Sequence, residues 1–464
     1  MTFSSYGFLL AFLPVVVVVY WLVPRGRARL VFLFLASCVF YGYWSWRFVP
    51  LLLVATLVAW VAGRLLVVSS TRRRRRAILC AAVFVNVSLL AYFKYRGFFL
   101  DSIDGALRLA RANDSLPVLD VILPIGISFY TFTAISYAVD IYRGAIAPAK
   151  SIFHYYAWVT MFPYITAGPI IRYDHVGHQL EAADRQRFSW TLIGTGLFFL
   201  ILGLAKKVLF ADVMAPYVNE LFAQPDDLAL LTGWGAALGY TLQLYFDFSG
   251  YSDMAVGVAF MLGVRFPQNF NSPYKAVNVS EFWRRWHMTL SGWLRDYLYI
   301  PLGGSRGRQL LTVRNLFITF LLGGLWHGPA WTFVIWGLLW AAYLSVHSTL
   351  RARGWTPGSA WLNRLVTFAC AVVAWVFFRA ASVGDALGVL RAMLGLNGVV
   401  GGRLTLAPVF VALVVGGLVW VNAAPNTWQL KPTSSIRCAV LLGVLLGASI
   451  LALGKPSAFL YFQF

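Results

Sequence analysis

A series of apolar segments, each close to the length of a membrane helix, restricts the fold more than any other feature of this chain. A span takes about 20 predominantly apolar residues, and backbone groups in hydrocarbon must find hydrogen bonds inside the protein, which favours helices. The segments are residues 8–23, 30–46, 51–68, 78–93, 121–139, 198–210, 228–246, 316–344, 366–378, 407–421 and 440–453. They predict an all-α polytopic membrane protein, one integral-membrane domain over residues 1–464, with about 11 to 13 membrane segments, some re-entrant.

The composition agrees with a membrane protein. Hydrophobic residues make up 60% of the chain and charged residues only 12%, which excludes an ordinary soluble domain. The net charge is +21, from 38 basic and 17 acidic residues, but the basic residues mostly flank apolar segments, where topology and anionic lipid explain them. We therefore expect membrane lipid as a partner and no nucleic acid. A basic cytoplasmic surface would also attract the phosphates of an acyl-coenzyme A or an acidic carrier protein.

The basic clusters predict the orientation in the membrane. Arg25, Arg27 and Arg29 follow the first apolar segment, and residues 72–76 are all arginine. By the positive-inside rule both loops are cytoplasmic, which places the N-terminus in the periplasm. Because no basic residue precedes Arg25, we expect the first segment to be a span rather than a cleavable signal peptide.

One histidine lies in an otherwise uncharged apolar stretch. His327 follows Trp326 within residues 316–344, which contain no Lys, Arg, Asp or Glu. An imidazole in a membrane span is costly to desolvate, so it is a candidate functional residue. The stretch is predicted to be either one long span or two spans joined at Gly328 and Pro329.

Polar residues are unusually dense between positions 240 and 304. Gln243, Asp247 and Ser249 directly follow an apolar run, and such groups at membrane depth face protein or a water-filled cavity. They line a tunnel or form a hydrogen-bonded network between helices, and for Asp247 both alternatives stay open.

Farther on, residues 281–290 have the spacing of an interfacial amphipathic helix. Trp283 and Trp286 share one apolar face, and Arg284 and Arg285 point away from it. His287 lies between the apolar and the polar face. Residues 97–117 are expected to form a second amphipathic helix on the outer face. Residues 172–187 and 223–227 are expected to be loops.

Signatures of other enzyme classes are missing from the sequence. There is no G-x-S-x-G elbow, no Walker loop, no H-E-x-x-H and no cysteine spacing typical of a metal site. We expect neither a metal nor a bound cofactor. Histidine is left as the conspicuous catalytic residue type.

Motifs along nearly the whole chain resemble those of the membrane-bound O-acyltransferases. They are FSS at 3–5 with the run to Pro24, LPIGISFY at 123–130, AGPI at 167–170, YFDFSG at 245–250, WRRWH at 283–287, YLYIPLGG at 297–304, GLWHG at 324–328, FRA at 378–380 and YFQF at 461–464. The opening and closing motifs favour the bacterial branch that O-acetylates polysaccharides such as alginate over the branch that transfers D-alanine.

This resemblance implies a ring of membrane helices around a thinned centre, where a funnel and a tunnel meet at His327. His327 would be the general base, or a transient nucleophile, in acyl transfer from a cytoplasmic thioester, either acetyl-coenzyme A or an acyl carrier protein. His287 would orient the donor or stabilise charge.

Other residues would support the two histidines. Gln243, Asp247, Ser249 and Trp326 would line or support the tunnel, and Arg284 and Arg285 would meet the donor's phosphates. The resemblance also implies location in the inner membrane and a periplasmic acetyltransferase, or another exopolysaccharide-modifying protein, as partner.

Two other classes of protein remain as alternatives. A transporter or flippase would explain the buried polar residues, but it would call for proton-relay carboxylates, which this acid-poor chain has few of. A structural scaffold for an export complex would not need the Trp-His-Gly element. We therefore predict an O-acyltransferase.

Overall fold

The computed structural model describes residues 1–109, 122–182, 186–355, 358–400, 405–433, 435–453 and Leu460. Within these ranges every regular element is a helix. The chain divides into two compact units: unit 1 is Met1–Phe3, Gly7–Ile193 and Val258–Pro267, and unit 2 is Ser4–Tyr6, Gly194–Gly257 and Gln268–Phe464. One functional domain over residues 1–464 stays a prediction.

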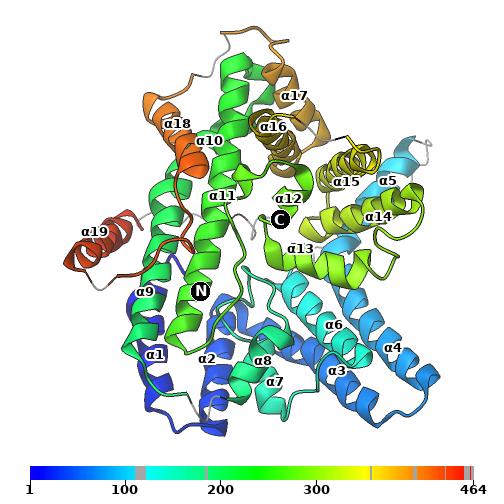
Figure 1. The fold of residues 1–464 in the computed structure, drawn as a ribbon, viewed down its shortest axis with the longest axis vertical. Helices are drawn as coiled ribbons and strands as arrows, with labels where there is room; N and C mark the ends of the chain where they lie inside the picture. Colours follow the sequence, from blue (N-terminus) through cyan, green and yellow to red (C-terminus); the bar gives the residue numbers. More distant parts are fainter. Residues whose placement is uncertain are drawn as a thin grey trace. The chain divides into compact units, whose positions relative to one another are not determined.

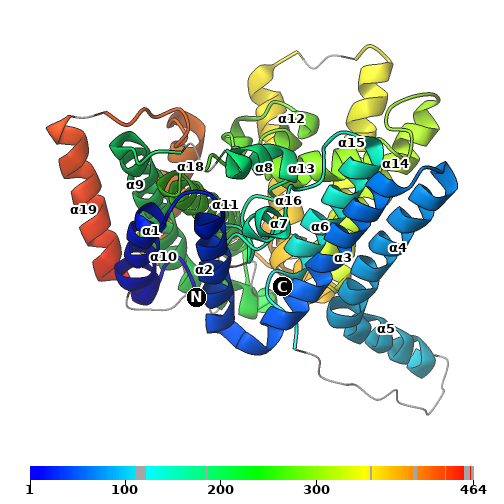
Figure 2. The same cartoon turned by 90° about the horizontal axis from the view of Figure 1, so that it is seen from below.

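Unit 1 is built from the helices of the first apolar segments. They are the π-helix η1 (Gly7–Phe12), α1 (Leu13–Leu22), α2 (Arg27–Ser45), the short η2 (Trp46–Phe48), α3 (Val49–Val68), α4 (Arg72–Leu90), the π-helix η3 (Ala91–Tyr95), α5 (Arg96–Leu109), α6 (Ile127–Arg143), α7 (Ile152–Val159) and α8 (Tyr173–Glu181). Helices α3, α4 and α6 pack side by side, as both views show (Figures 1 and 2). Tyr41, Leu52 and Tyr130 are buried in their core.

Unit 2 contains the remaining helices. They are α9 (Trp190–Ala205, whose first residues belong to unit 1), the π-helix η4 (Lys206–Ala211), α10 (Asp212–Ala223), η5 (Pro225–Asp227), α11 (Leu230–Met261, whose last turn belongs to unit 1), η6 (Pro273–Lys275), α12 (Val279–Trp283), α13 (Met288–Leu294), the π-helix η7 (Arg295–Tyr299), α14 (Gln309–His327), α15 (Trp331–Ala352), α16 (Ala360–Arg379), α17 (Val383–Met393), α18 (Pro408–Ala423) and α19 (Ile436–Ala452).

Glycines bring α9 and α11 of unit 2 into close contact. A Cβ atom on Gly203 would lie 2.5 Å from the carbonyl oxygen of Gly250, and one on Gly250 would lie 2.6 Å from the carbonyl oxygen of Gly203. A Cβ on Gly257 would meet the carbonyl oxygen of Gly196 at 2.5 Å, two turns farther along both helices. Small residues at this spacing let membrane helices approach backbone to backbone.

Five helical segments of the described residues are long and apolar enough to cross a membrane: Arg27–Val68, Arg72–Gly105, Gln309–His327, Trp331–Ala352 and Ala360–Arg379. Shorter apolar helices cover Gly7–Leu22, Pro408–Ala423 and Ile436–Ala452. An all-helical chain with several membrane-length helices is thereby confirmed.

Several local predictions are settled by the helix boundaries. The stretch 316–344 forms two helices, because α14 ends at His327 and α15 begins at Trp331. The prediction of a loop at 172–187 is wrong, since α8 occupies Tyr173–Glu181. The predicted helix over 97–117 is observed as far as Leu109, the end of α5, and the rest of it lies outside the described residues, as does the YFQF motif.

The predicted continuous helix over 281–290 is also wrong. Helix α12 ends at Trp283 and α13 begins only at Met288. Between them His287 has a positive φ of 40°, a left-handed conformation that interrupts a right-handed helix. Trp283 and Trp286 are both buried, as their shared face predicts.

Candidate active site

His327 is the last residue of α14 and is 5% exposed. The following helix α15 turns back against α14, because glycines stand where the backbones touch. A Cβ on Gly324 would lie 2.3 Å from the carbonyl oxygen of Phe333, and one on Gly337 would lie 2.3 Å from that of Phe320. This tight hairpin fixes the imidazole of His327 against the first turns of α15.

Aromatic rings surround His327. The ring centroids of Trp326 and Trp336 lie 4.8 Å from that of the imidazole, and that of Phe378 lies 5.0 Å away. Trp336 and Phe378 meet the imidazole at interplanar angles of 82° and 72°. Such a surround of aromatic rings packs tightly against the imidazole and excludes water from it.

His287 lies in the same unit, close to the same tryptophan. Its side chain is fully buried, 4.7 Å from the ring of Phe248 on α11 and 6.2 Å from the ring of Trp326. Trp326 thus contacts both histidines. The structure brings together three of the residues singled out from the sequence, His287, Trp326 and His327.

Asn269 fixes which nitrogen of His287 carries the proton. The backbone N–H of Thr289 donates to Oδ1 of Asn269 at 3.3 Å, and the Thr289 hydroxyl donates to it at 2.9 Å, which identifies that atom as the carbonyl oxygen. Nδ2 of Asn269 donates to the hydroxyl of Ser252 at 3.0 Å. Nδ1 of His287 lies 3.1 Å from the same oxygen and must be the donor, because a carbonyl oxygen has no proton. The neutral ring therefore carries its proton on Nδ1 and keeps Nε2 as the acceptor.

Burial keeps His287 neutral. The loss of hydration lowers the pKa of His287 from 6.5 to about 3, since an imidazolium is costly away from water. At neutral pH the side chain is therefore a hydrogen-bonding group of fixed polarity and not a cation.

Asp247 belongs to a buried ion-pair network. Its carboxylate lies 2.6 Å from Nζ of Lys207 and accepts the backbone N–H of Leu460 at 3.1 Å. Lys207 also pairs with Asp212 at 2.6 Å. Of the two alternatives left open for Asp247, the network between helices is the one that these contacts support.

Gln243 and Ser249 are buried on α11, on either side of Asp247. The residue of this helix that packs against His287 is Phe248. A tunnel-lining role of Gln243 and Ser249 stays a prediction.

The two arginines of the WRRWH motif have different surroundings. Arg285 pairs with Glu281 at 2.7 Å and donates to the backbone carbonyl of Asn271 at 3.1 Å, so it holds α12 to the preceding loop. Arg284 is exposed and lines a cleft of about 480 Å³.

Tryptophan side chains separate this cleft from His327. Its lining residues come from α12, α13, η7, α14 and α15, and they are Ser280, Trp283, Arg284, Met288, Ser291, Gly292, Leu294, Arg295, Tyr299, Leu316, Thr319, Phe320 and Leu344. The ring centroid of Trp283 lies 5.9 Å from that of Trp336, which in turn contacts His327. A single indole ring therefore stands between a residue of the cleft wall and the imidazole.

Sequence reasoning missed Asn269, Trp336 and Phe378 as site residues. Phe378 stands in the FRA motif and Asn269 in the polar run after α11, but neither position signals which histidine it contacts. Trp336 is one tryptophan among 19 in the chain. Only the fold shows that these three side chains hold the two histidines.

Comparisons with known proteins show the family of the chain. Residues 145–383 match the family model described as MBOAT, membrane-bound O-acyltransferase family. The chain is 37% identical to the probable alginate O-acetylase of Azotobacter vinelandii, over 100% of both chains. It is 40% identical to the probable alginate O-acetylase of Pseudomonas aeruginosa, over 85% of this chain and 75% of the relative, and 38% identical to the peptidoglycan O-acetyltransferase of Helicobacter pylori, over 86% and 80%.

The match covers both histidines, the interrupted helix that carries His287 and the hairpin that carries His327. It also agrees with the membrane-length helices of both units. The chain belongs to the membrane-bound O-acyltransferase family and is a multi-pass membrane O-acyltransferase.

Proposed function

We propose that this chain moves an acetyl group from a cytoplasmic thioester across the membrane for O-acetylation of an extracytoplasmic polysaccharide. The observation that carries the proposal is the buried set of His287, Trp326 and His327 in a chain 37% identical, along its whole length, to a probable alginate O-acetylase. Relatives named as O-acetylating enzymes favour acetyl over D-alanyl transfer.

His327 acts as the general base in this scheme. The attacking hydroxyl gives its proton to the imidazole as its oxygen bonds to the thioester carbonyl carbon. The C–S bond then breaks, and the proton passes to the departing thiolate. The rings of Trp336 and Phe378 pack against the imidazole and hold it in place during these two steps. Direct attack by His327, through an acyl-imidazole, leads to the same products.

His287 orients a reacting group rather than supplying charge. Because its pKa is about 3, it stays neutral during turnover. Its Nε2 accepts a hydrogen bond, since Asn269 holds the proton on Nδ1. The family resemblance implies that His287 either orients the donor or stabilises charge. The neutral, hydrogen-bonding imidazole favours the orienting role.

The cleft lined by Arg284 receives the donor. Its volume of about 480 Å³ falls in the range of small-molecule sites, and the exposed guanidinium of Arg284 suits a phosphate group. Thr319 and Phe320 of α14 line the cleft some seven residues before His327, or about 10 Å along the helix. The acyl end of a donor in the cleft would have to pass Trp283 and Trp336 to reach the imidazole.

The ends of α14 and α15 support an inward-facing cleft. Arg306 and Arg308 precede α14, and Arg351 and Arg353 lie at the end of α15, whereas His327 closes the opposite end of α14. By the positive-inside rule the basic end faces the cytoplasm. We extend the proposal to a ring of about 11 to 13 membrane segments in the inner membrane, with a periplasmic N-terminus.

The acceptor of the acetyl group is a hydroxyl on a partner protein or a short relay, delivered from the periplasm. Few long polar segments are left in this chain to recognise a hydrated glycan. A separate periplasmic acetyltransferase would then complete the transfer to polysaccharide. Complete acetylation of polysaccharide by the purified chain alone would contradict this relay.

The test is acetyl transfer in proteoliposomes that contain the purified protein and acetyl-coenzyme A labelled in the acetyl group. We expect release of the label from the thioester by the wild type and a loss of about 10²- to 10⁴-fold for His327→Ala, with normal insertion. His178→Ala, which changes an exposed histidine on α8, is the matched control. Equal label release by wild type and His327→Ala would contradict the role of His327, and transport of intact donor without thioester cleavage would indicate the transporter.

A further inference from the structure

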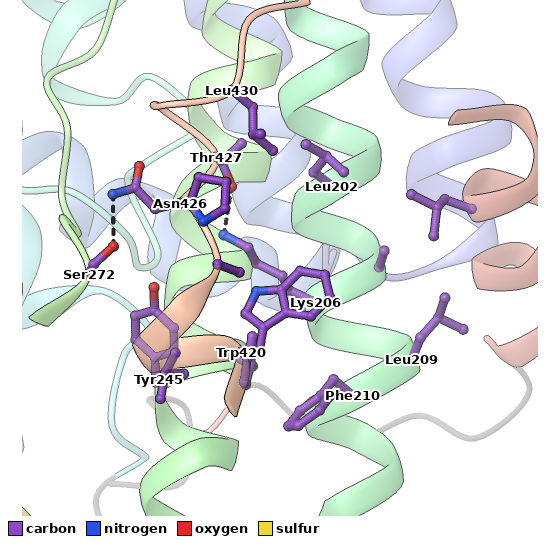
Figure 3. Close-up of a pocket in the computed structure, with 16 residues that line it drawn as sticks. Leu202, Lys206, Leu209, Phe210, Tyr245, Ser272, Trp420, Asn426, Thr427 and Leu430 are labelled. Carbon is purple, nitrogen blue, oxygen red and sulfur yellow. Dashed lines mark hydrogen bonds between the residues drawn. The ribbon is translucent and has the colours of Figure 1, made fainter. Parts of the chain in front are cut away.

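Unit 2 contains an apolar cavity apart from both histidines. It has a volume of about 220 Å³ and is bordered by α9, η4, α11, α18, α19 and the segment after α18. Its apolar lining includes Leu202, Leu209, Phe210, Trp420 and Leu445 (Figure 3). Trp420 is 59% exposed, so the cavity reaches the surface of the unit.

The helix on the outer side of this cavity is barely packed against protein. Of α19, only Ser449 is buried, while Val440, Leu441 and Val444 are each about 60% exposed. Figures 1 and 2 both show α19 beside α9 at the margin of its unit. A membrane protein with exposed apolar side chains at this place meets lipid hydrocarbon there.

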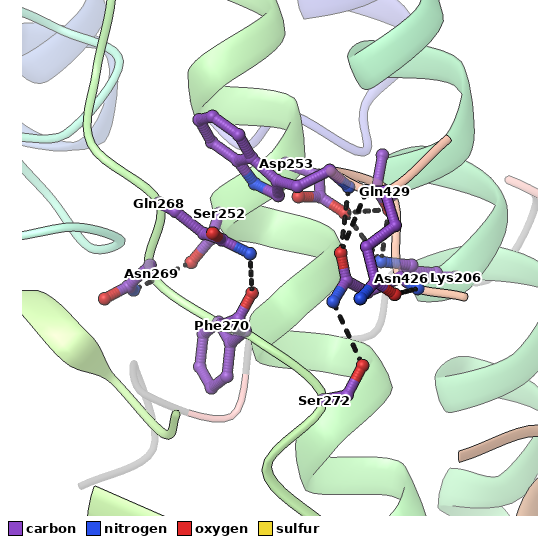
Figure 4. Close-up of polar contacts among 11 residues, drawn as sticks. Lys206, Ser252, Asp253, Gln268, Asn269, Phe270, Ser272, Asn426 and Gln429 are labelled. Atoms are coloured by element: carbon purple, nitrogen blue, oxygen red, sulfur yellow. Dashed lines mark hydrogen bonds and ion pairs between the residues drawn. The ribbon is translucent and has the colours of Figure 1, made fainter. Parts of the chain in front are cut away.

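One end of the cavity is polar and electrically neutral. Nζ of Lys206 lies 2.6 Å from Asp253 and 2.7 Å from the hydroxyl of Thr427. The side chains of Lys206 and Asp253 are 16% and 7% exposed, so the pair is largely withdrawn from solvent. Asn426 stands beside them and donates to Ser272 at 3.0 Å (Figure 4).

This end suits a neutral acceptor rather than an anion. An ammonium group has three N–H donors, and Asp253 and Thr427 take two of those of Lys206. Asp253 already balances the charge, so an added phosphate or carboxylate would leave an uncompensated negative charge in an apolar site. An ester carbonyl accepts the third N–H without adding charge.

The lining of the cavity suits a hydrocarbon chain, because apolar side chains, chiefly of leucine, phenylalanine and tryptophan, form most of it. A single hydrocarbon chain is narrow enough to enter between Leu202, Leu209 and Leu445. It would be supplied by the bilayer that surrounds the protein.

We propose that the cavity binds one acyl chain of a bilayer glycerophospholipid, whose ester carbonyl accepts a hydrogen bond from Lys206. The bound chain fills the space between α19 and the body of unit 2. The lipid's headgroup lies outside the cavity and takes no part in recognition. This proposal is independent of the acyl-transfer chemistry.

Binding is tested by native mass spectrometry of the full chain, delipidated in detergent and then titrated with defined lipids. The probes are a diester phosphatidylethanolamine and its diether analogue with the same chains, which lacks the carbonyl groups. We expect one diester lipid to bind about tenfold more tightly than the diether lipid, the effect of one hydrogen bond to a charged donor. Equal binding of the two lipids would overturn the contact with Lys206.

Two variants locate the site. Ala205→Trp places an indole in the cavity and should abolish the bound lipid, whereas Leu441→Trp, on the exposed face of α19, should retain it. Retention of lipid by folded Ala205→Trp, measured by its size-exclusion profile and thermal unfolding, would place the site elsewhere. If Ala205→Trp fails to fold, the double change Lys206→Met with Asp253→Asn removes both charges together and should erase the preference for diester lipid.

Lipids with different headgroups test whether the site recognises charge. Phosphatidylglycerol and phosphatidylethanolamine with the same ester chains should bind within a factor of about two, because the contact is to a neutral carbonyl. A preference of tenfold or more for the anionic lipid, or tighter binding of a free fatty acid than of either phospholipid, would show that the site recognises charge and would overturn the proposal.

Discussion

Replacing Asn269 tests how His287 is held. The side chain of Asn269 makes four hydrogen bonds, to Ser252, to His287 and two to Thr289. In Asn269→Ala the buried donors of His287 and Thr289 lose their acceptor, and each such group costs about 1–3 kcal/mol when left unsatisfied. Since the costs overlap, we expect a loss of about 2–4 kcal/mol in unfolding free energy.

The effect on catalysis follows from the tautomer. Without the acceptor at Asn269, His287 no longer keeps its proton on Nδ1, and Nε2 ceases to be a dependable acceptor. Loss of an orienting hydrogen bond of this kind typically costs about 10- to 100-fold, so we expect kcat for thioester consumption to fall by that factor with little change in KM. Asn269→Asp keeps an acceptor at the same position and should recover most of the rate.

The assay is steady-state acetyl-coenzyme A consumption in proteoliposomes, with unfolding followed in the same preparations. Gln179→Ala, which removes a hydrogen-bonding amide from α8 of unit 1, is the control for a general loss of stability. If Asn269→Ala lost stability but kept its kcat, or if Asn269→Asp were no better than Asn269→Ala, the reasoning about the tautomer would be refuted.

Three further predictions concern packing, pH and sidedness. Gly250→Leu forces a side chain into the backbone of α9 and should sharply reduce the unfolding temperature and the yield. Gly416→Ala should be tolerated, because a Cβ at that position meets nothing within 4 Å. Equal stability of the two variants would contradict the close contact between the helices. The pKa of His287 is about 3 in the folded protein and near 6.5 in the unfolded chain, so the unfolded chain binds the extra proton and stability should fall as pH decreases from 6.5 towards 3. In the variant His287→Gln the thermal unfolding temperature should decline less steeply over this range. An identical decline in the two proteins would argue against a neutral buried His287. A cysteine at Ser5 should react with an impermeant thiol reagent from the periplasm while one at Ser70 should not, and the reverse pattern would overturn the orientation.

The membrane character and the apolar surroundings of His327 could be predicted from the sequence because both depend on local composition. An apolar run without charged residues identifies a span wherever it folds, and one imidazole within it stands out. The boundary between α14 and α15 at Gly328 and Pro329 is only one of two alternatives that the sequence leaves open. The packing of the two helices cannot be predicted, because the contacts of Gly324 and Gly337 form only when the helices meet.

The surroundings of His287 could not be predicted for a related reason. The spacing of Trp283, Trp286 and Leu290 fits a continuous helix, and nothing local announces a left-handed residue at position 287. That conformation is held by Asn269, 18 residues earlier in the chain. The same holds for Asp247, whose role depends on Lys207 in another helix.

The short connection between α14 and α15 limits which insertions the chain tolerates. Residues 328–330 join two helices whose backbones already touch, so the connection cannot change its length without moving one of the helices. An added residue there would have to bulge outward or shift α15 by part of a turn, and either change withdraws Trp336 from His327. Related sequences should therefore vary in length at the loop before Gln309 and keep a constant length between His327 and Trp331.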